Sequence, residues 1–140
     1  MKKITVAVVL DDNGGMMIFG KRQSRDRVMI ADFVSAIGDK PIFVSPFSKI
    51  IFEPHESVNF VENPFLESVD GGACFIENFA LTPYIDMIET LIVYRWNTLY
   101  PSDVRFDVDI EKSGFTLVST YDFEGSSHER ITKEIYKKQY

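Results

Sequence analysis

The segment Ile4–Leu10 restricts the fold more than any other feature, because seven consecutive residues are apolar or β-branched. A strand with one face in water alternates apolar and polar residues, whereas a strand covered on both faces is apolar almost throughout. The run therefore predicts a central strand with other elements packed on both of its faces. The residues that follow, Asp11-Asp12-Asn13-Gly14-Gly15, favour a turn.

A helix is predicted after the polar stretch that follows this turn. Ser24 is the expected N-cap, and Asp26 in the first turn suits the positive end of the helix dipole. Apolar side chains then recur at helical spacing along Ile30–Ile37, which is typical of a helix with one buried face. Gly38 is expected to end the helix.

The middle of the chain alternates short apolar runs with short helical segments. Strands are predicted at Pro41–Val44, Val58–Val61, Ala73–Ile76 and Leu91–Tyr94. Helical turns are predicted at Asn63–Leu66 and Pro83–Ile88, while Phe47–Phe52 fits either a helical turn or an edge strand. Because helices link most of these strands, we expect the strands to pair in parallel.

The last third of the chain has a different pattern. Asp103–Ile110 alternates apolar and polar residues, which predicts a strand with one buried face, and Phe115–Phe123 predicts another strand. Ser126, with Glu129 three residues later, is a capping-box signal for a helix. Arg130–Lys138 nevertheless alternates as an edge strand would, so spacing leaves both structures open.

Length and composition predict one domain, 1–140, in the cytoplasm. The net charge of −6 argues against a nucleic-acid binder and against a polybasic membrane-surface protein. No apolar run approaches the roughly 20 residues of a membrane helix. Asp11-Asp12 ends the first apolar run too early for a signal peptide. The single cysteine, Cys74, lies in an apolar run, is expected in the core, and cannot form an internal disulfide.

The order of these elements resembles the dihydrofolate reductase family in a shortened form. The resemblance rests on Ile4–Leu10 followed by Asp11, on the helix-to-strand step Asp39–Val44, and on the strand–helix–strand from Ala73 to Tyr94. It implies an α/β fold of three layers, with a mostly parallel central sheet. It also implies a C-terminal antiparallel hairpin within Asp103–Tyr136, which favours a strand at the end of the chain.

The chain departs from the family where the family binds its cofactor. Glu77-Asn78-Phe79 stands where the family has glycines that let the backbone approach a pyrophosphate. Ser45-Pro46-Phe47 replaces a turn that makes further phosphate contacts, and the family's helix-borne carboxylate falls near Met29, with Asp32 one turn later. These departures imply that no cofactor is bound and that reductase activity is lost.

Charged residues around the first loop and helix are the main candidates for a binding site. The candidates in this region are Asp11, Asp12, Arg22, Arg25, Arg27 and Asp32. The loop after a central strand is where open α/β sheets usually bind ligands, although a plain turn also fits. Arginines at the start of a helix favour an anion, and a solvated surface paired with nearby aspartates is the alternative.

A second candidate region follows Leu91–Tyr94. Arg95 and Trp96 can stack on a planar ligand or contact a partner protein, and packing of Trp96 over the edge of the core is the alternative. Ser126 and His128 share a face if they lie on a strand, but the sequence identifies no third group for catalysis. No metal-ligand pattern is present.

These features predict a binding or regulatory protein for a small anionic ligand or a partner, on a scaffold that lacks the dinucleotide site. The alternative is an enzyme that acts on a phosphate- or carboxylate-bearing substrate through Asp11, Asp12 and Arg25. The sequence does not identify catalytic groups. It leaves the oligomeric state open, with a homodimer among the options.

Overall fold

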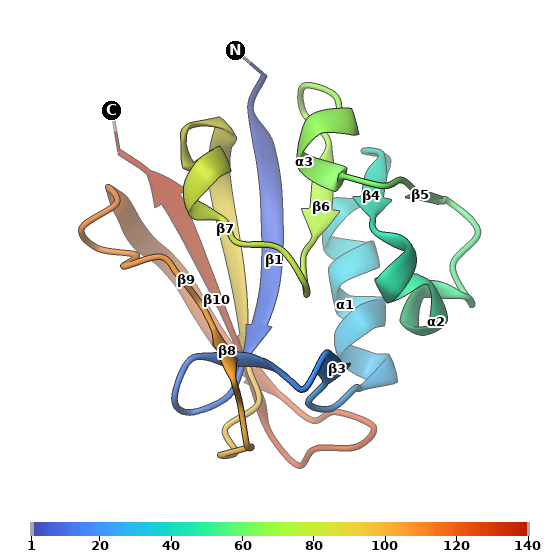
Figure 1. The fold of residues 1–140 in the computed structure, drawn as a ribbon, viewed down its shortest axis with the longest axis vertical. Helices are drawn as coiled ribbons and strands as arrows, with labels where there is room; N and C mark the ends of the chain where they lie inside the picture. The colour runs from blue at the N-terminus through green and yellow to red at the C-terminus, as the bar shows by residue number, and fades with distance from the viewer. Residues whose placement is uncertain (1, 140) are drawn as a thin grey trace.

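The computed structural model describes residues 2–139, and its main sheet has seven strands in the order β5-β4-β6-β1-β7-β10-β9 (Figure 1). The strands are β1 (Ile4–Leu10), β4 (Ile42–Val44), β5 (Val58–Phe60), β6 (Ala73–Phe75), β7 (Ile88–Arg95), β9 (Phe115–Phe123) and β10 (Ile131–Lys138). The strands from β5 to β7 pair in parallel, and β10 pairs antiparallel with both β7 and β9. The mostly parallel sheet with a C-terminal antiparallel hairpin is confirmed.

The remaining elements are short, apart from one helix. A small sheet is formed by β2 (Gly15–Ile18), β3 (Lys21–Arg22) and β8 (Val104–Arg105). The helices are α1 (Arg27–Ile37), α2 (Lys49–Phe52), α3 (Pro64–Glu67) and the 3-10 turns η1 (Pro46–Ser48) and η2 (Thr82–Met87). Phe47–Phe52 is therefore helical. No helix within residues 2–139 is long and apolar enough to cross a membrane.

Two buried clusters explain why β1 is apolar throughout. Ala7 and Val9 point to the face covered by α1 and α2, while Val6, Val8 and Leu10 point to the face covered by α3 and β2. Strand residues alternate between faces, so covering both faces requires an unbroken apolar run. This arrangement confirms the three layers.

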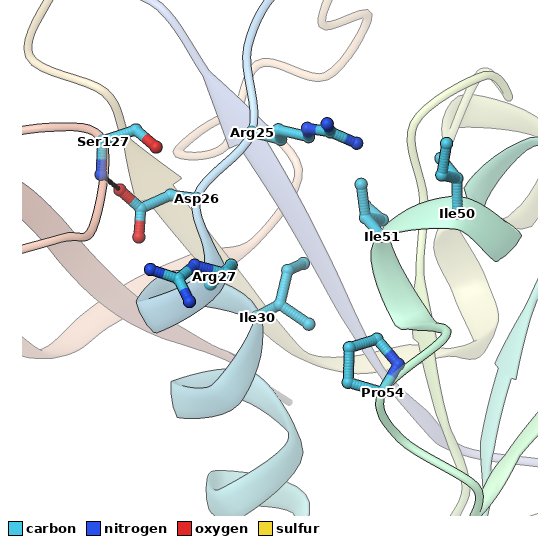
Figure 2. Close-up of a pocket in the computed structure, with 8 residues that line it drawn as sticks. All are labelled: Arg25, Asp26, Arg27, Ile30, Ile50, Ile51, Pro54 and Ser127. Carbon is cyan, nitrogen blue, oxygen red and sulfur yellow. Dashed lines mark hydrogen bonds between the residues drawn. The ribbon is translucent and has the colours of Figure 1, made fainter.

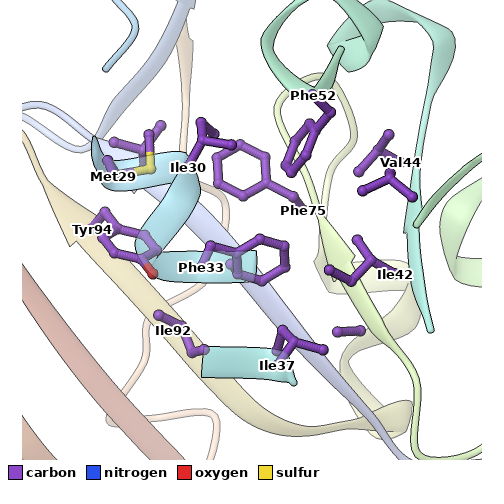
Figure 3. Close-up of a cluster of buried hydrophobic side chains, with 14 of the residues drawn as sticks. Met29, Ile30, Phe33, Ile37, Ile42, Val44, Phe52, Phe75, Ile92 and Tyr94 are labelled. Atoms are coloured by element: carbon purple, nitrogen blue, oxygen red, sulfur yellow. The ribbon is translucent and has the colours of Figure 1, made fainter. Parts of the chain in front are cut away.

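Aromatic side chains form the centre of the cluster beneath α1 (Figure 3). Phe33 of α1, Phe52 of α2 and Phe75 of β6 meet edge to face, with ring centroids 5.4–6.2 Å apart. All three side chains are buried. This packing holds the beginning of α1 beside α2, where the candidate site lies.

The N-terminus of α1 differs from the prediction. Asp26 is the N-cap, and its carboxylate accepts hydrogen bonds from the N–H groups of Val28 and Met29, so the prediction of Ser24 as the cap is wrong. Ser24 lies too early in the chain to reach these donors and hydrogen-bonds elsewhere. The C-terminus is as predicted, because Gly38 ends the helix with a φ of 67°.

The predicted strand at 103–110 is largely wrong. Only β8, Val104–Arg105, is a strand, and Val104 is exposed. The alternation reflects a different structure, because Phe106 and Val108 pack half-buried against the face of the sheet opposite α1. Between them, the Asp107 carboxylate accepts hydrogen bonds from the backbone at the start of η2. These bonds hold the segment beside η2, where it does not pair with another strand.

The end of the chain forms a strand, as the resemblance implied, but β10 is not at the edge of the sheet. It lies between β7 and β9, and its Ile131 and Lys133 side chains are buried. The capping-box signal does not start a helix of its own. Instead, Ser126 Oγ accepts a hydrogen bond from the N–H of Arg27, at the first turn of α1.

Candidate functional site

Several loops meet where the parallel strands end, at the lower edge of the sheet in Figure 1. They are residues 11–14 after β1, 23–26 before α1, 96–103 after β7, and 124–130 between β9 and β10. Open α/β sheets bind ligands at the carboxyl ends of their strands, so this edge is the expected place for a site.

Asp11 is buried and holds its own loop together. Its Oδ1 accepts from the N–H of Gly15 at 2.7 Å and from a second loop N–H, and its Oδ2 accepts from Tyr100 N and Gln23 Nε2. Burial raises the pKa of Asp11, but these hydrogen bonds outweigh burial and lower it below its usual value. With four hydrogen bonds, the carboxylate has little capacity left to accept a substrate proton. Asp12, by contrast, is exposed.

Arg22 forms an ion pair across the ends of β4 and β6. Its Nε and Nη2 donate to the two carboxylate oxygens of Glu77 at 2.6 and 2.7 Å, and its guanidinium lies over the Phe47 ring. Glu77, directly beyond β6, also accepts from Ser48 Oγ at 2.6 Å and is buried. A paired, bidentate arginine is a poor first contact for an anion, because its donors are already occupied.

Arg25 and Arg27 are exposed, and neither side chain has a hydrogen-bond or ion-pair partner within residues 2–139. They lie beside a pocket of about 410 Å³ between α1 and α2. The apolar lining comes from Ile30, Ile50, Ile51 and Pro54. Figure 2 shows the Arg25 side chain extending over this pocket toward α2, while the Arg27 guanidinium points toward the other side of α1.

Asp26 joins α1 to the loop between β9 and β10. Besides capping the helix, it accepts from the N–H groups of Ser126 and Ser127 at 2.9 and 2.7 Å, and from His128 Nδ1 at 3.2 Å. Burial raises the pKa of Asp26, but these donors outweigh burial and lower it to about 2. The same carboxylate leaves no room for a Cβ atom at Gly125.

His128 lies between groups from two other segments, the one before α1 and the loop after β7. While Nδ1 faces Asp26, Nε2 lies 3.2 Å from Ser24 Oγ and 2.8 Å from the Tyr100 hydroxyl. The ring stacks on Trp96 with centroids 4.2 Å apart and planes at 16°. Sequence reasoning found no third group for His128, because Ser24 and Asp26 are about a hundred residues away in the chain and no local spacing links them to it.

Two predicted site residues lie away from this edge. Asp32 accepts hydrogen bonds from Lys133, Tyr94 and Tyr121, between α1 and the last strands. Burial raises the pKa of Asp32, but the lysine and the two hydroxyls lower it below its usual value. Arg95 pairs with Glu134 at 2.8 Å, on the face of β7 opposite to Trp96.

Trp96 itself is buried in the cluster beneath α1. The structure therefore brings Asp11, Arg22, Arg25, Arg27 and Trp96 to one edge and separates Asp32 and Arg95 from them. Among residues 2–139, no group of three or more His, Cys, Asp or Glu is placed to hold a metal ion. Cys74 is buried, and burial raises the pKa of its thiol to about 12.

Comparisons with known proteins identify the fold. No family model matches the sequence, and no curated protein matches it. Among solved structures, the chain is similar to dihydrofolate reductase from Enterococcus faecalis complexed with NADP(H) and RAB-propyl, with a TM-score of 0.68 and 12% sequence identity. The match covers 99% of this chain and 97% of that chain. The protein therefore has a dihydrofolate reductase-like α/β fold, as the order of its elements implied.

Proposed function

We propose that the protein binds a small anionic ligand in the pocket between α1 and α2. The observation that carries this proposal is Arg25, an unpaired guanidinium that extends over an apolar pocket in a protein of net charge −6. Of the other arginines at this edge, Arg22 is paired with Glu77, and the Arg27 guanidinium points to the other side of α1. An arginine without an internal partner is free to make charge-assisted hydrogen bonds to a carboxylate or phosphate.

The lining defines the chemistry of the ligand. Ile30, Ile51 and Pro54 offer apolar surface, so the ligand should carry a flat or aliphatic body attached to its anionic group. A volume of about 410 Å³ lies within the range of about 300–1,000 Å³ that is usual for small-molecule pockets. The proposed class is an organic carboxylate or phosphate monoester with an apolar body.

The proposal excludes a nicotinamide dinucleotide as the ligand, unlike the similar reductase, whose structure contains NADP(H). The turn beyond β6 carries the buried Glu77 carboxylate, and the adjacent Asn78 accepts a hydrogen bond from Ser45. A pyrophosphate in this turn would meet a negative charge and would have to break the pair with Arg22. We expect no NADPH binding in a fluorescence titration, and micromolar affinity would contradict this part of the proposal.

A thermal-shift screen tests the anion site directly. The probes are inorganic phosphate, phosphorylated sugars, nucleotides, aliphatic dicarboxylates and aromatic carboxylates, each against the unmodified protein. A ligand at 100 times its dissociation constant should add about 2.7 kcal/mol to the free energy of unfolding. Organic anions with an apolar body should give the largest shifts, and neutral analogues of the same body should give none.

Arginine variants then locate the site. Arg25→Ala should abolish the ligand-induced shift while the stability of the free protein changes little, because the side chain has no internal partner. Arg105→Ala removes an equal charge from exposed β8, which does not line the pocket, and should leave the shift unchanged. Equal loss of binding in the two variants, or full binding by Arg25→Ala, would refute the pocket as the site.

A further inference from the structure

The segment before α1, the loop between β9 and β10, and the loop after β7 together build an arrangement that the sequence does not reveal. Ser24 Oγ lies 3.2 Å from His128 Nε2, and the opposite ring nitrogen, Nδ1, lies 3.2 Å from Asp26 Oδ2. A hydroxyl, an imidazole and a buried carboxylate thus follow one another in hydrogen-bond contact. This order is the one in which a serine is activated as a nucleophile.

The hydrogen bonds also determine the tautomer of His128. An ionised Asp26 can only accept, so in the neutral imidazole Nδ1 carries the proton and Nε2 presents its lone pair. In that tautomer the single lone pair of Nε2 accepts from Ser24 or from Tyr100, and acceptance from Ser24 is the direction that proton removal requires. Stacking on Trp96 and the hydrogen bond to Asp26 hold the imidazole in this orientation.

Ser24 is also accessible to a substrate. It is half-buried and lies beside a second cavity of about 530 Å³, together with the cationic side chains Lys21, Arg22 and Arg25. The backbone N–H groups of Ser24 and Arg25 have no acceptor within residues 2–139. Ser24 and Arg25, whose N–H groups are unpaired, both line this cavity, and the exposed Lys21 adds a positive charge, which favours a carbonyl oxygen that becomes negative during attack.

We propose that Ser24, His128 and Asp26 form a nucleophilic site that hydrolyses a small carboxylic ester through an acyl-serine intermediate. Ser24 Oγ forms a bond to the ester carbonyl carbon as its proton passes to His128 Nε2. The tetrahedral intermediate then expels the alkoxide, which takes that proton and leaves as the alcohol. Water adds to the acyl-serine with His128 as base, releases the carboxylic acid and restores the Ser24 hydroxyl.

Tyr100 has a separate part in this arrangement. Its hydroxyl lies closer to Nε2 than Ser24 Oγ does, so it competes for the lone pair in the resting protein. Without that hydroxyl, Ser24 should be the only side chain that donates a hydrogen bond to Nε2. We therefore expect Tyr100→Phe to acylate at least as fast as the unmodified protein.

Covalent labelling tests the proposal on the full chain. A fluorophosphonate probe and p-nitrophenyl acetate are each incubated with the protein, and adducts are located by intact-mass and peptide mass spectrometry. A single adduct on Ser24 is expected, with none in Ser24→Ala. Removing the base in His128→Gln should slow labelling by about 100-fold. Absence of an adduct, an adduct on another residue, or equal labelling of His128→Gln would overturn the proposal.

The neighbouring serine provides a matched control. Ser127 is exposed at the same edge, but its hydroxyl makes no hydrogen bond within residues 2–139, so Ser127→Ala should label normally. A thiol at each position gives a test that does not depend on loss of His128. Ser24→Cys should react with iodoacetamide about tenfold faster than Ser127→Cys at neutral pH, because the imidazole favours the thiolate. Equal rates for the two thiols would also refute the proposal.

The buried Cys74 should not contribute to alkylation, because its thiol is buried and its pKa is raised to about 12. The anion pocket is tested separately, because Ser24 is not among the residues that line it, so Ser24→Ala should abolish labelling and leave the ligand-induced thermal shift unchanged. The two proposals therefore fail separately.

Discussion

Replacing Asp26 with alanine should destabilise the protein strongly, because one carboxylate caps α1 and anchors the loop between β9 and β10. Loss of an N-cap costs about 1 kcal/mol. The same change leaves three further N–H donors, those of Ser126, Ser127 and His128 Nδ1, without their acceptor, while the Ser126 hydroxyl can turn to water. Because this loop can turn partly toward water, each donor should cost about 1 kcal/mol, at the lower end of the range for an unsatisfied buried group.

The free energy of unfolding of Asp26→Ala should therefore fall by about 3–4 kcal/mol, which lowers Tm by about 10 °C in a domain of this size. Urea denaturation, monitored by tryptophan fluorescence, measures this free energy, since the only tryptophan, Trp96, stacks on His128. Ser24→Ala is the control, because Ser24 makes one half-buried hydrogen bond and should cost about 0.5–1 kcal/mol. An Asp26→Ala effect within about 1 kcal/mol, or an equal effect of Ser24→Ala, would refute this assignment of the cap.

The stability of the protein should also depend on pH through Asp26. Its folded pKa of about 2 lies below the usual value, so its stabilising contribution is present above about pH 4 and is lost as the pH falls toward 2. The pKa values of Asp11, Asp32 and Asp107 are also lowered, so they contribute in the same window. Asp26→Asn should flatten part of this acid dependence in urea titrations across that window. If the free energy of unfolding of Asp26→Asn falls with pH as steeply as that of the unmodified protein, Asp26 is not an ionised N-cap.

Three further predictions concern other contacts. Gly125→Ala should lower Tm by several degrees in a thermal melt, because a Cβ there would collide with the Asp26 carboxylate; an unchanged Tm would count against the observed loop. Lys133→Met should cost about 3 kcal/mol in urea, because it leaves the Asp32 carboxylate without its cation, and a cost near zero would refute that role. Asp107→Ala should destabilise by about 1–2 kcal/mol and Arg105→Ala by less than about 0.5 kcal/mol, because of the two only Asp107 caps η2. Equal urea midpoints for the two variants would refute this role of Asp107.

Elements whose structure depends on local pattern could be predicted from the sequence. The apolar run Ile4–Leu10 required cover on both faces and became the central β1, with α1 on one side and α3 on the other. The spacing of Ile30–Ile37 and the left-handed Gly38 specified the buried face and the end of α1. Strand β9 has the predicted bounds, Phe115–Phe123.

Where several local structures were compatible with the same residues, tertiary contacts selected one. Ser24 and Asp26 are both good caps, but only Asp26 also meets the N–H groups of the 124–130 loop. The residues Arg130–Lys138 suited a helix or a strand. They form a strand because in that conformation their backbone pairs with both β7 and β9. Residues 103–110 alternate as a strand would, but the Asp107 carboxylate accepts hydrogen bonds from the N–H groups at the start of η2, and most of the segment is not a strand.

The candidate sites depended almost entirely on the tertiary structure. Glu77 pairs with Arg22, 55 residues earlier, which leaves Arg25 and Arg27 as the cations beside the pocket that have no partner within residues 2–139. His128 meets Ser24 and Asp26 only because β10 returns along β7 and brings its preceding loop to the start of α1. Periodicity and capping signals report contacts between residues a few positions apart. Groups separated by about a hundred residues are brought together by sheet order, which no local spacing encodes.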